Sequence, residues 1–92
     1  MQELNAKDLE RMFFNQLGKC NLTGVELGPD TLTADHIQPM EDGGSNTADN
    51  VQIVHDIINT MKGSLSNDQF IEWCCRVADY SRMSEDERFD IE

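Results

Sequence analysis

The chain is poor in basic residues and in long apolar runs, and each shortage excludes a class of protein. Only seven Lys and Arg stand against 18 Asp and Glu, a formal net charge of −11 over 92 residues. A domain that binds nucleic acid unaided normally presents a basic face, so this balance argues against such a binder. Apolar stretches such as 12–14 and 73–75 are too short for a membrane span or a secretion signal. We therefore expect no membrane association and a cytoplasmic location.

Cysteine is also scarce, and its placement argues against a disulfide framework. The chain has three cysteines, of which Cys74 and Cys75 are neighbours that can hardly pair with each other without strain. We expect reduced thiols. The length suits one small domain, which we place at residues 1–83. Residues 84–92 carry five acidic side chains against one arginine, and we expect them to form a solvated acidic tail.

Helical spacing of apolar residues marks both ends of the domain. Asn5 can cap a helix over residues 5–17, and Ser66 with Gln69 forms a capping-box pattern for a helix over residues 67–81. We expect the apolar sides of these two helices to pack against the middle of the chain. The residues expected to do so are Phe13, Phe14, Leu17, Phe70, Ile71 and Trp73.

The middle of the chain predicts a strand, a loop, a second strand and a helix. Glycines and a proline in 18–30 favour a loop that includes a short hairpin. Residues 31–34 and 51–53 have the composition of short strands, with Gly43-Gly44 in the loop between them. The apolar spacing then becomes helical from His55 and stops at Gly63. The whole chain is therefore expected to be a small α+β protein.

Residues able to bind a cation or accept a proton are concentrated between Ala34 and Gly63. In order, they and the residues that frame them are Asp35-His36, Pro39, Gly43-Gly44, Asp49-Asn50, His55, Asn59 and Lys62-Gly63. This ordered set resembles the HNH endonuclease family, whose fold is the ββα-metal, or His-Me finger, motif. The resemblance covers residues 20–63. It implies an α+β domain in which this motif is flanked by the two helices.

The resemblance also implies a role for four of these residues. His36 would be the general base that takes a proton from water, a task suited to an imidazole near neutral pH. Asp35 and Asn59 would be the ligands of one Mg²⁺ or Mn²⁺ ion, for which hard oxygen donors are suited. Asn50 would tie the loop to the strand and help to orient the base. Successive strand residues point to opposite faces, so some distortion must bring Asp35 and His36 to one site.

For two further residues, the sequence is consistent with two different roles. His55 lies four residues before Asn59, on the same face of the expected helix, and is either a third metal ligand or a packing residue. Lys62 would either contact a backbone phosphate of the substrate or remain solvated at the helix end, where its charge favours the helix dipole.

One common feature of the family is not expected here. Many members hold the motif together with a structural zinc bound by two Cys-x-x-Cys pairs, and the corresponding positions are Cys20 with Thr23 and His55 with Ile58. Because Thr23 and Ile58 cannot replace thiolates, we predict no structural zinc. Cys20 is then expected to be a small buried apolar residue.

Two functions follow from these observations. The first is a metal-dependent DNA endonuclease that nicks one strand per site. Its acidity suggests a catalytic module to which another domain or subunit delivers the DNA, as in restriction, phage, homing or CRISPR-associated systems. The alternative is a non-catalytic acidic protein that mimics DNA or docks on a basic partner. The set Asp35, His36, Asn50 and Asn59 favours the nuclease, because a mimic has no need of a base beside a cation ligand.

Overall fold

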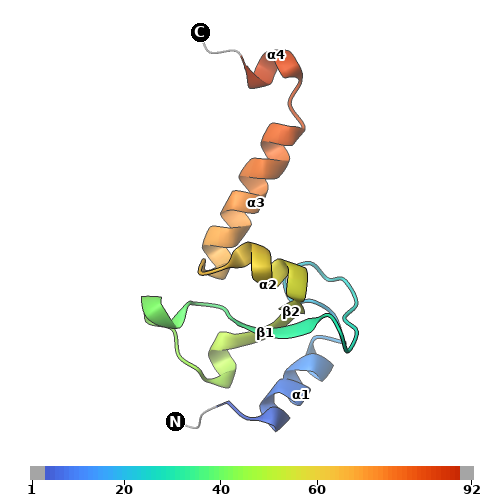
Figure 1. The fold of residues 1–92 in the computed structure, drawn as a ribbon, viewed down its shortest axis with the longest axis vertical. Helices are drawn as coiled ribbons and strands as arrows, with labels where there is room; N and C mark the ends of the chain where they lie inside the picture. The colour runs from blue at the N-terminus through green and yellow to red at the C-terminus, as the bar shows by residue number, and fades with distance from the viewer. Residues whose placement is uncertain (1–3, 90–92) are drawn as a thin grey trace.

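The computed structural model describes residues 4–89 and is strongly elongated. Its extents are 55 × 29 × 18 Å and its radius of gyration is 16.3 Å, whereas a compact chain of this length would have a radius of about 12 Å. Figure 1 shows the cause: a small body holds both strands, and a long helix projects from it. Across residues 4–89, no helix is long and apolar enough to cross a membrane.

The body contains the strand, loop, strand and helix order that the sequence predicts. β1 (Leu32–His36) and β2 (Val51–His55) form an antiparallel pair, and α2 (Asp56–Lys62) follows β2 directly. Two short 3-10 helices, η1 (Met40–Asp42) and η2 (Ala48–Asn50), lie in the loop between the strands. The α+β class and the ββα arrangement are therefore confirmed.

The first helix is tied to the strand pair by a glutamine. α1 (Ala6–Asn15) begins at a capping box in which Asn5 and Asp8 exchange side-chain and backbone hydrogen bonds. Just beyond its end, the Gln16 amide donates to the carbonyl of Ile53 at 2.8 Å and accepts from the Ile53 N–H at 3.0 Å. Gln16 thus satisfies backbone groups on the edge of β2, which would otherwise lack strand partners.

The last part of the chain forms two helices. α3 (Asn67–Ser81) has the bounds predicted from sequence, and its capping box joins Ser66 and Gln69. α4 (Glu85–Arg88) lies in the segment expected to be a solvated tail, and it is capped by Ser84. A capping box formed within the acidic segment therefore gives it local structure that its charge alone does not suggest.

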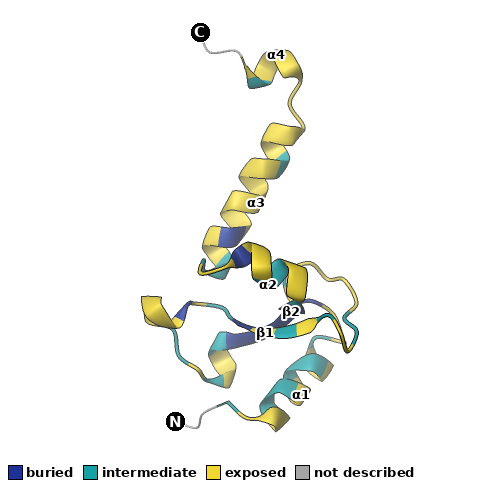
Figure 2. Cartoon of the chain, viewed as in Figure 1, coloured by how far each residue is buried: buried dark blue, intermediate teal, exposed yellow. Residues whose placement is uncertain are grey.

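The buried core is smaller than expected and consists mainly of residues of β2. Phe14 and Leu17 are 67% and 79% exposed, and Ile71 and Trp73 are 47% and 58% exposed, so their predicted packing is wrong. Figure 2 shows that almost the whole of α3 is exposed. Helical spacing identifies the apolar side of a helix but does not determine whether anything covers it. The buried apolar residues are Cys20, Val51, Ile53, Val54 and Phe70.

Candidate functional site

The two residues expected to carry the chemistry stand at the end of β1 and border one pocket. Asp35 and His36 are the last two residues of this strand. Both line a pocket that is completed by η1 and by the turn after α2. Because the chain leaves the sheet after His36, side chains from both faces of the strand can reach this opening. Glu41 adds a second carboxylate to the pocket lining, and no sequence signal had selected it.

Lys62 is buried beneath this pocket in an ion pair with Asp35. The lysine is 1% exposed and the aspartate 8% exposed, and Lys62 Nζ lies 2.7 Å from Asp35 Oδ2. The same ammonium donates to the backbone carbonyl of His36 at 2.6 Å. Neither interpretation made from the sequence, a phosphate contact or a solvated helix-end lysine, describes this position. Lys62 instead joins α2 to the two adjacent residues of β1.

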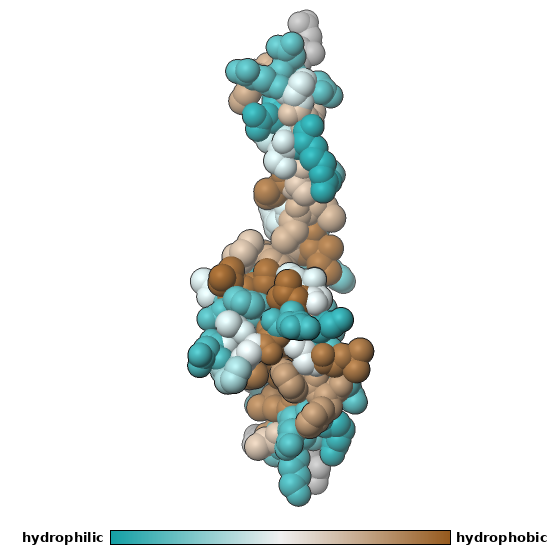
Figure 3. Space-filling model, turned by 90° about the vertical axis from the view of Figure 1, so that its right-hand side faces the viewer, coloured by the Kyte–Doolittle hydropathy of each residue, from teal (hydrophilic) through white to brown (hydrophobic). Residues whose placement is uncertain are grey.

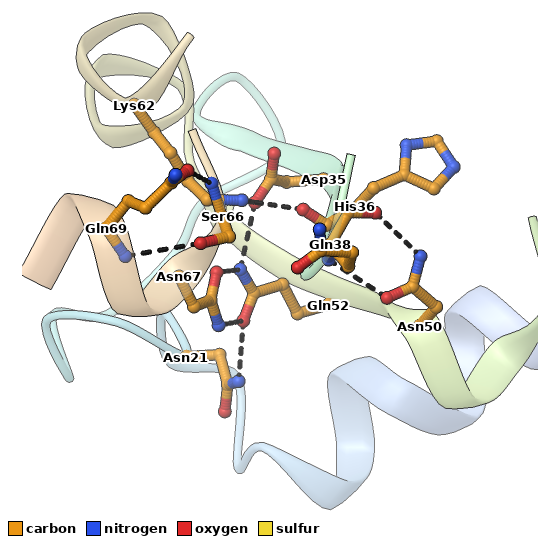
Figure 4. Close-up of polar contacts among 10 residues, drawn as sticks. All are labelled: Asn21, Asp35, His36, Gln38, Asn50, Gln52, Lys62, Ser66, Asn67 and Gln69. Carbon is orange, nitrogen blue, oxygen red and sulfur yellow. Dashed lines mark hydrogen bonds and ion pairs between the residues drawn. The ribbon is translucent and has the colours of Figure 1, made fainter. Parts of the chain in front are cut away.

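A buried glutamine completes the surroundings of the aspartate. Gln52 lies opposite Asp35 in the strand pair, and its amide donates to Asp35 Oδ2 at 2.9 Å. The same amide group exchanges two hydrogen bonds with Asn67 at the start of α3, at 2.7 and 3.0 Å (Figure 4). Among residues 4–89, no hydrogen bond reaches the other oxygen, Asp35 Oδ1. One oxygen is therefore held by the protein while the second is left for another partner.

Neither Gln52 nor Asn67 was predicted from the sequence. A polar residue between Val51 and Ile53 was the available signal, because such a residue in a buried strand must find hydrogen-bond partners inside the protein. Its partners could not be named, since Asn67 is fifteen residues away in the sequence and lies on another element.

The ring of His36 is held by an asparagine from the loop. His36 Nε2 lies 2.9 Å from Asn46 Oδ1. An amide oxygen can only accept, so Nε2 carries the proton and donates, and the lone pair of a neutral ring is then on Nδ1. This contact selects the tautomer that a base at Nδ1 requires. Asn46 was not selected from the sequence, because nothing local distinguishes it from any other polar loop residue.

Asn50 fastens the loop that carries Asn46. Its Oδ1 accepts from the Gln38 N–H at 2.9 Å, and its Nδ2 donates to the carbonyls of Gln38 and Ser45 at 2.9 and 2.8 Å. The side chain thus joins the beginning and the end of the loop to the start of β2, in agreement with its expected tying role. An influence on the orientation of His36 through Asn46 stays a prediction.

Gly44 lies against Gln38 and Asn50 in this loop, and its substitution should lower the stability of the protein. A Cβ built on Gly44 would stand 2.0 Å from the carbonyl oxygen of Gln38 and 2.7 Å from Asn50 Nδ2. We expect Gly44→Ala to lower the free energy of unfolding by about 2 to 3 kcal/mol, because the loop must move apart to accept the methyl group. Gly28→Ala is the control, since a Cβ there meets only Thr31 Oγ1 at 3.9 Å. Equal denaturation midpoints for the two variants would contradict this description of the loop.

The structure does not bring His55 to the aspartate. His55 pairs with Leu32 at the far end of the strand pair, three residues from the level of Asp35, which corresponds to about 10 Å along the strand. It is the N-cap of α2 rather than a helix residue, and its Nδ1 accepts from the Ile57 N–H at 3.1 Å. The strand continues two residues beyond the predicted end. His55 therefore stands at the junction of β2 and α2 rather than within the helix.

Asn59 lies on α2 and does not line the pocket that Asp35 and His36 border. It is half-buried and three residues before Lys62, so the two share one face of α2. Lys62 reaches Asp35 from that face. Within residues 4–89, no group of three or more His, Cys, Asp or Glu could hold a metal ion. A carboxylate oxygen and an amide oxygen still fit a hard divalent cation such as Mg²⁺, which commonly keeps several of its own waters.

Cys20, which stands at one of the positions where many HNH endonucleases hold zinc, is a buried thiol. Burial raises the pKa of the Cys20 thiol, but hydrogen bonds from the Thr23 side chain and from backbone N–H groups of His55, Leu22 and Thr23 lower it by more, so the pKa is lowered overall. Cys20 is 3% exposed, as expected for a small buried residue. The loop of residues 19–26, which contains Cys20, is closed by a β-bridge between Lys19 and Glu26.

Comparisons with known proteins agree with this fold. The sequence profile of the HNH endonuclease family matches residues 18–65, more than half of the chain. Among solved structures, the chain resembles one described as the crystal structure of a type II restriction endonuclease, with a TM-score of 0.60 and 23% sequence identity. The match covers 72% of this chain and 35% of that one, so this chain spans about a third of its length. Among curated proteins, none matches the sequence.

The chain belongs to the HNH endonuclease family. The matched residues include both strands, the loop between them and α2, and therefore every residue described at the site except Asn67. The likeness to the restriction endonuclease is one of fold. The family assignment supports a nuclease, and divalent metal ions are the general cofactors of that family.

Proposed function

We propose that this domain is a divalent-metal-dependent DNA endonuclease that hydrolyses one phosphodiester bond per site and so nicks one strand. The observation that carries the proposal is the contact between His36 Nε2 and Asn46 Oδ1 at 2.9 Å, which leaves Nδ1 to act as a base. Asp35 lies in the same pocket with one oxygen that the described part of the protein does not use.

Each residue then has one task. His36 takes a proton from the attacking water at Nδ1, while Asn46 keeps the ring in the required tautomer and orientation. Asp35 Oδ1 and the Asn59 amide oxygen would hold the Mg²⁺ or Mn²⁺ ion. Such an ion supplies positive charge that offsets the charge on the phosphoryl oxygens and the leaving group. Lys62 and Gln52 keep Asp35 in place through its other oxygen.

The charge distribution supports a catalytic module to which another domain or subunit delivers the DNA. Among residues 4–89, most basic side chains are already engaged: Lys62 is buried, and Arg11, Arg76 and Arg82 pair with nearby acidic side chains. Such a surface offers few cations to DNA phosphates, whose neutralisation normally supplies most of the binding free energy. Delivery by a partner removes the need for a basic surface on this domain.

The acidity also keeps one alternative open: an HNH scaffold that docks on a basic partner without cleaving DNA. A net charge of −11 favours it. The buried ion pair of Lys62 with Asp35 disfavours this alternative, because a docking protein gains nothing from a carboxylate fixed beside an oriented histidine.

Nicking of supercoiled plasmid in Mg²⁺ or Mn²⁺ tests the proposal. We expect conversion to the open-circular form that EDTA abolishes and that Asn59→Ala reduces by at least about tenfold, because the cation would lose one of two protein ligands. The affinity of Asn59→Ala for Mn²⁺, measured by calorimetry, should fall together with its nicking activity. A folded protein that neither nicks nor binds Mn²⁺ would favour the docking alternative.

A further inference from the structure

α3 carries an apolar surface that the rest of the structure does not cover. At 100° per residue, its charged side chains fall within roughly 80° of the helix circumference, and apolar side chains occupy more than half of it. Those charged residues are Asp68, Glu72, Arg76 and Asp79. Phe70 alone is buried along the fifteen residues of the helix. A helix of this length is only marginally stable in water without packing, so a partner for its apolar surface is to be expected.

Two parts of this surface can be distinguished by their neighbours. On one side, α4 folds back: the Tyr80 hydroxyl donates to the Arg88 carbonyl at 3.1 Å, and the Arg88 guanidinium lies 5.4 Å from the Tyr80 ring centre. On the other side lies an open groove between α2 and α3, which we call the α2–α3 groove. Figure 3 shows apolar atoms gathered where the projecting helix joins the body. The groove is lined in large part by Ile58 and Met61 of α2 and by Ile71, Cys74, Cys75 and Ala78 of α3.

The charge of the surrounding segment indicates which partner fits. Residues 57–83 include most of α2 and all of α3, and apart from the buried Lys62 they contain two basic and three acidic side chains, a net charge of −1. Most of the net charge of −11 therefore lies outside this segment. Two copies of the chain can meet here with less of the repulsion that opposes contact elsewhere on their surfaces. A basic partner, by contrast, would be drawn to the acidic parts of the molecule.

We propose that the α2–α3 groove binds a second copy of this chain, with the two α3 helices antiparallel about a twofold axis. An ion pair can form at each end of the contact in that arrangement, because an acidic residue near the start of α3 meets a basic residue at its end. Pairing Asp68 with Arg82 of the second copy centres the contact on Cys75. The two residues lie on the same flank of the helix, and antiparallel packing brings like flanks together.

The size of this surface sets the expected strength of the contact. α3 is about 22 Å long, and with α2 it offers an interface at the small end of the specific range, below about 1,200 Å² in total. We therefore expect dissociation constants in the micromolar range rather than a permanent dimer. A pair of chains would carry two sites, the number that cutting both strands of a duplex requires. The pairing itself does not depend on the proposed nuclease activity.

Sedimentation equilibrium of the full chain tests the proposal without metal or DNA. We expect a shift from the monomer mass of 10.5 kDa toward twice that value as the concentration rises. Ile71→Glu, in the groove, should keep the protein monomeric. Val77→Glu is the matched control, because Val77 is 68% exposed on the α4 side of the same helix and should leave dimerisation unchanged.

Charge reversal and cross-linking test the antiparallel register. Asp68→Arg should weaken dimerisation by at least about tenfold, and Arg82→Asp added to it should restore the dimer, since the two charges are only exchanged. Diamide, which takes up the two electrons and two protons released by two thiols, should link the copies through Cys75. Cys75→Ser should abolish this link. A monomer at every concentration, or a dimer that Ile71→Glu leaves intact, would overturn the proposal.

Discussion

His36→Ala should lower the rate of plasmid nicking by about 10² to 10⁴-fold, the usual loss when a general base is removed. The affinity for Mn²⁺ should stay within a factor of about two or three, because His36 holds no metal in the proposed site. His36 is at the end of β1 and its ring is held by one contact to Asn46, so its removal leaves the strand pair intact. Initial nicking rates and calorimetric titration with Mn²⁺ measure the two quantities.

The other histidine provides the matched control. His55 lies at the opposite end of the strand pair, where it caps α2. His55→Ser keeps a side-chain oxygen for the Ile57 N–H and should retain nicking close to the original rate. If the two variants lost activity equally, histidine at the end of β1 would have no special part in the reaction and the assignment of the base would be wrong.

Lys62→Met should cost about 3 to 5 kcal/mol of unfolding free energy, the largest stability effect we expect in this chain. The methionine keeps the apolar stem but removes the ammonium, which leaves the carboxylate of Asp35 buried without its counter-charge. A small domain has only about 5 to 15 kcal/mol in total, so this variant is close to the limit of folding. Urea denaturation followed by circular dichroism measures the change.

A second substitution separates the ion pair from the shape of the side chain. Asp35→Asn added to Lys62→Met removes both charges and should recover more than half of the lost stability, because no unpaired buried charge remains. Lys19→Met, at an exposed position, should change stability by less than about 0.5 kcal/mol. Unchanged stability in Lys62→Met, with weaker DNA binding, would return this lysine to the role of a phosphate contact.

One local arrangement accounts for both effects: a buried cation holds one oxygen of Asp35 and leaves the other at the pocket. The ammonium also binds the carbonyl of His36, so α2 fixes the two adjacent residues of β1 through a single side chain. This accounts for how neighbours that alternate across a strand can serve one site. The fixed positions come from the helix and the loop, rather than from the strand itself.

Local pattern was sufficient for the start of two helices. Asn5 and Ser66 cap α1 and α3 as predicted, and the bounds of α3 were predicted to the residue, whereas α1 ends at Asn15 and not at residue 17. The order of Asp35, His36, Asn50 and Asn59 indicated the family that the comparison then identified. These signals depend on hydrogen bonds within one turn and on residue types at fixed spacing, both of which can be read from the chain alone.

Tertiary structure decided the rest, because contacts between distant elements leave little trace in local sequence. It placed Lys62 in the interior, twenty-seven residues from its partner Asp35, and moved His55 to the cap of α2. It left Trp73 exposed although helical spacing had predicted packing. The sequence by itself determined the order of the main helices and strands, the family, and Asp35, His36 and Asn50 as candidate groups of the site. Which of those groups meet, and which apolar face is left open, followed only from how the helices lie against the strand pair.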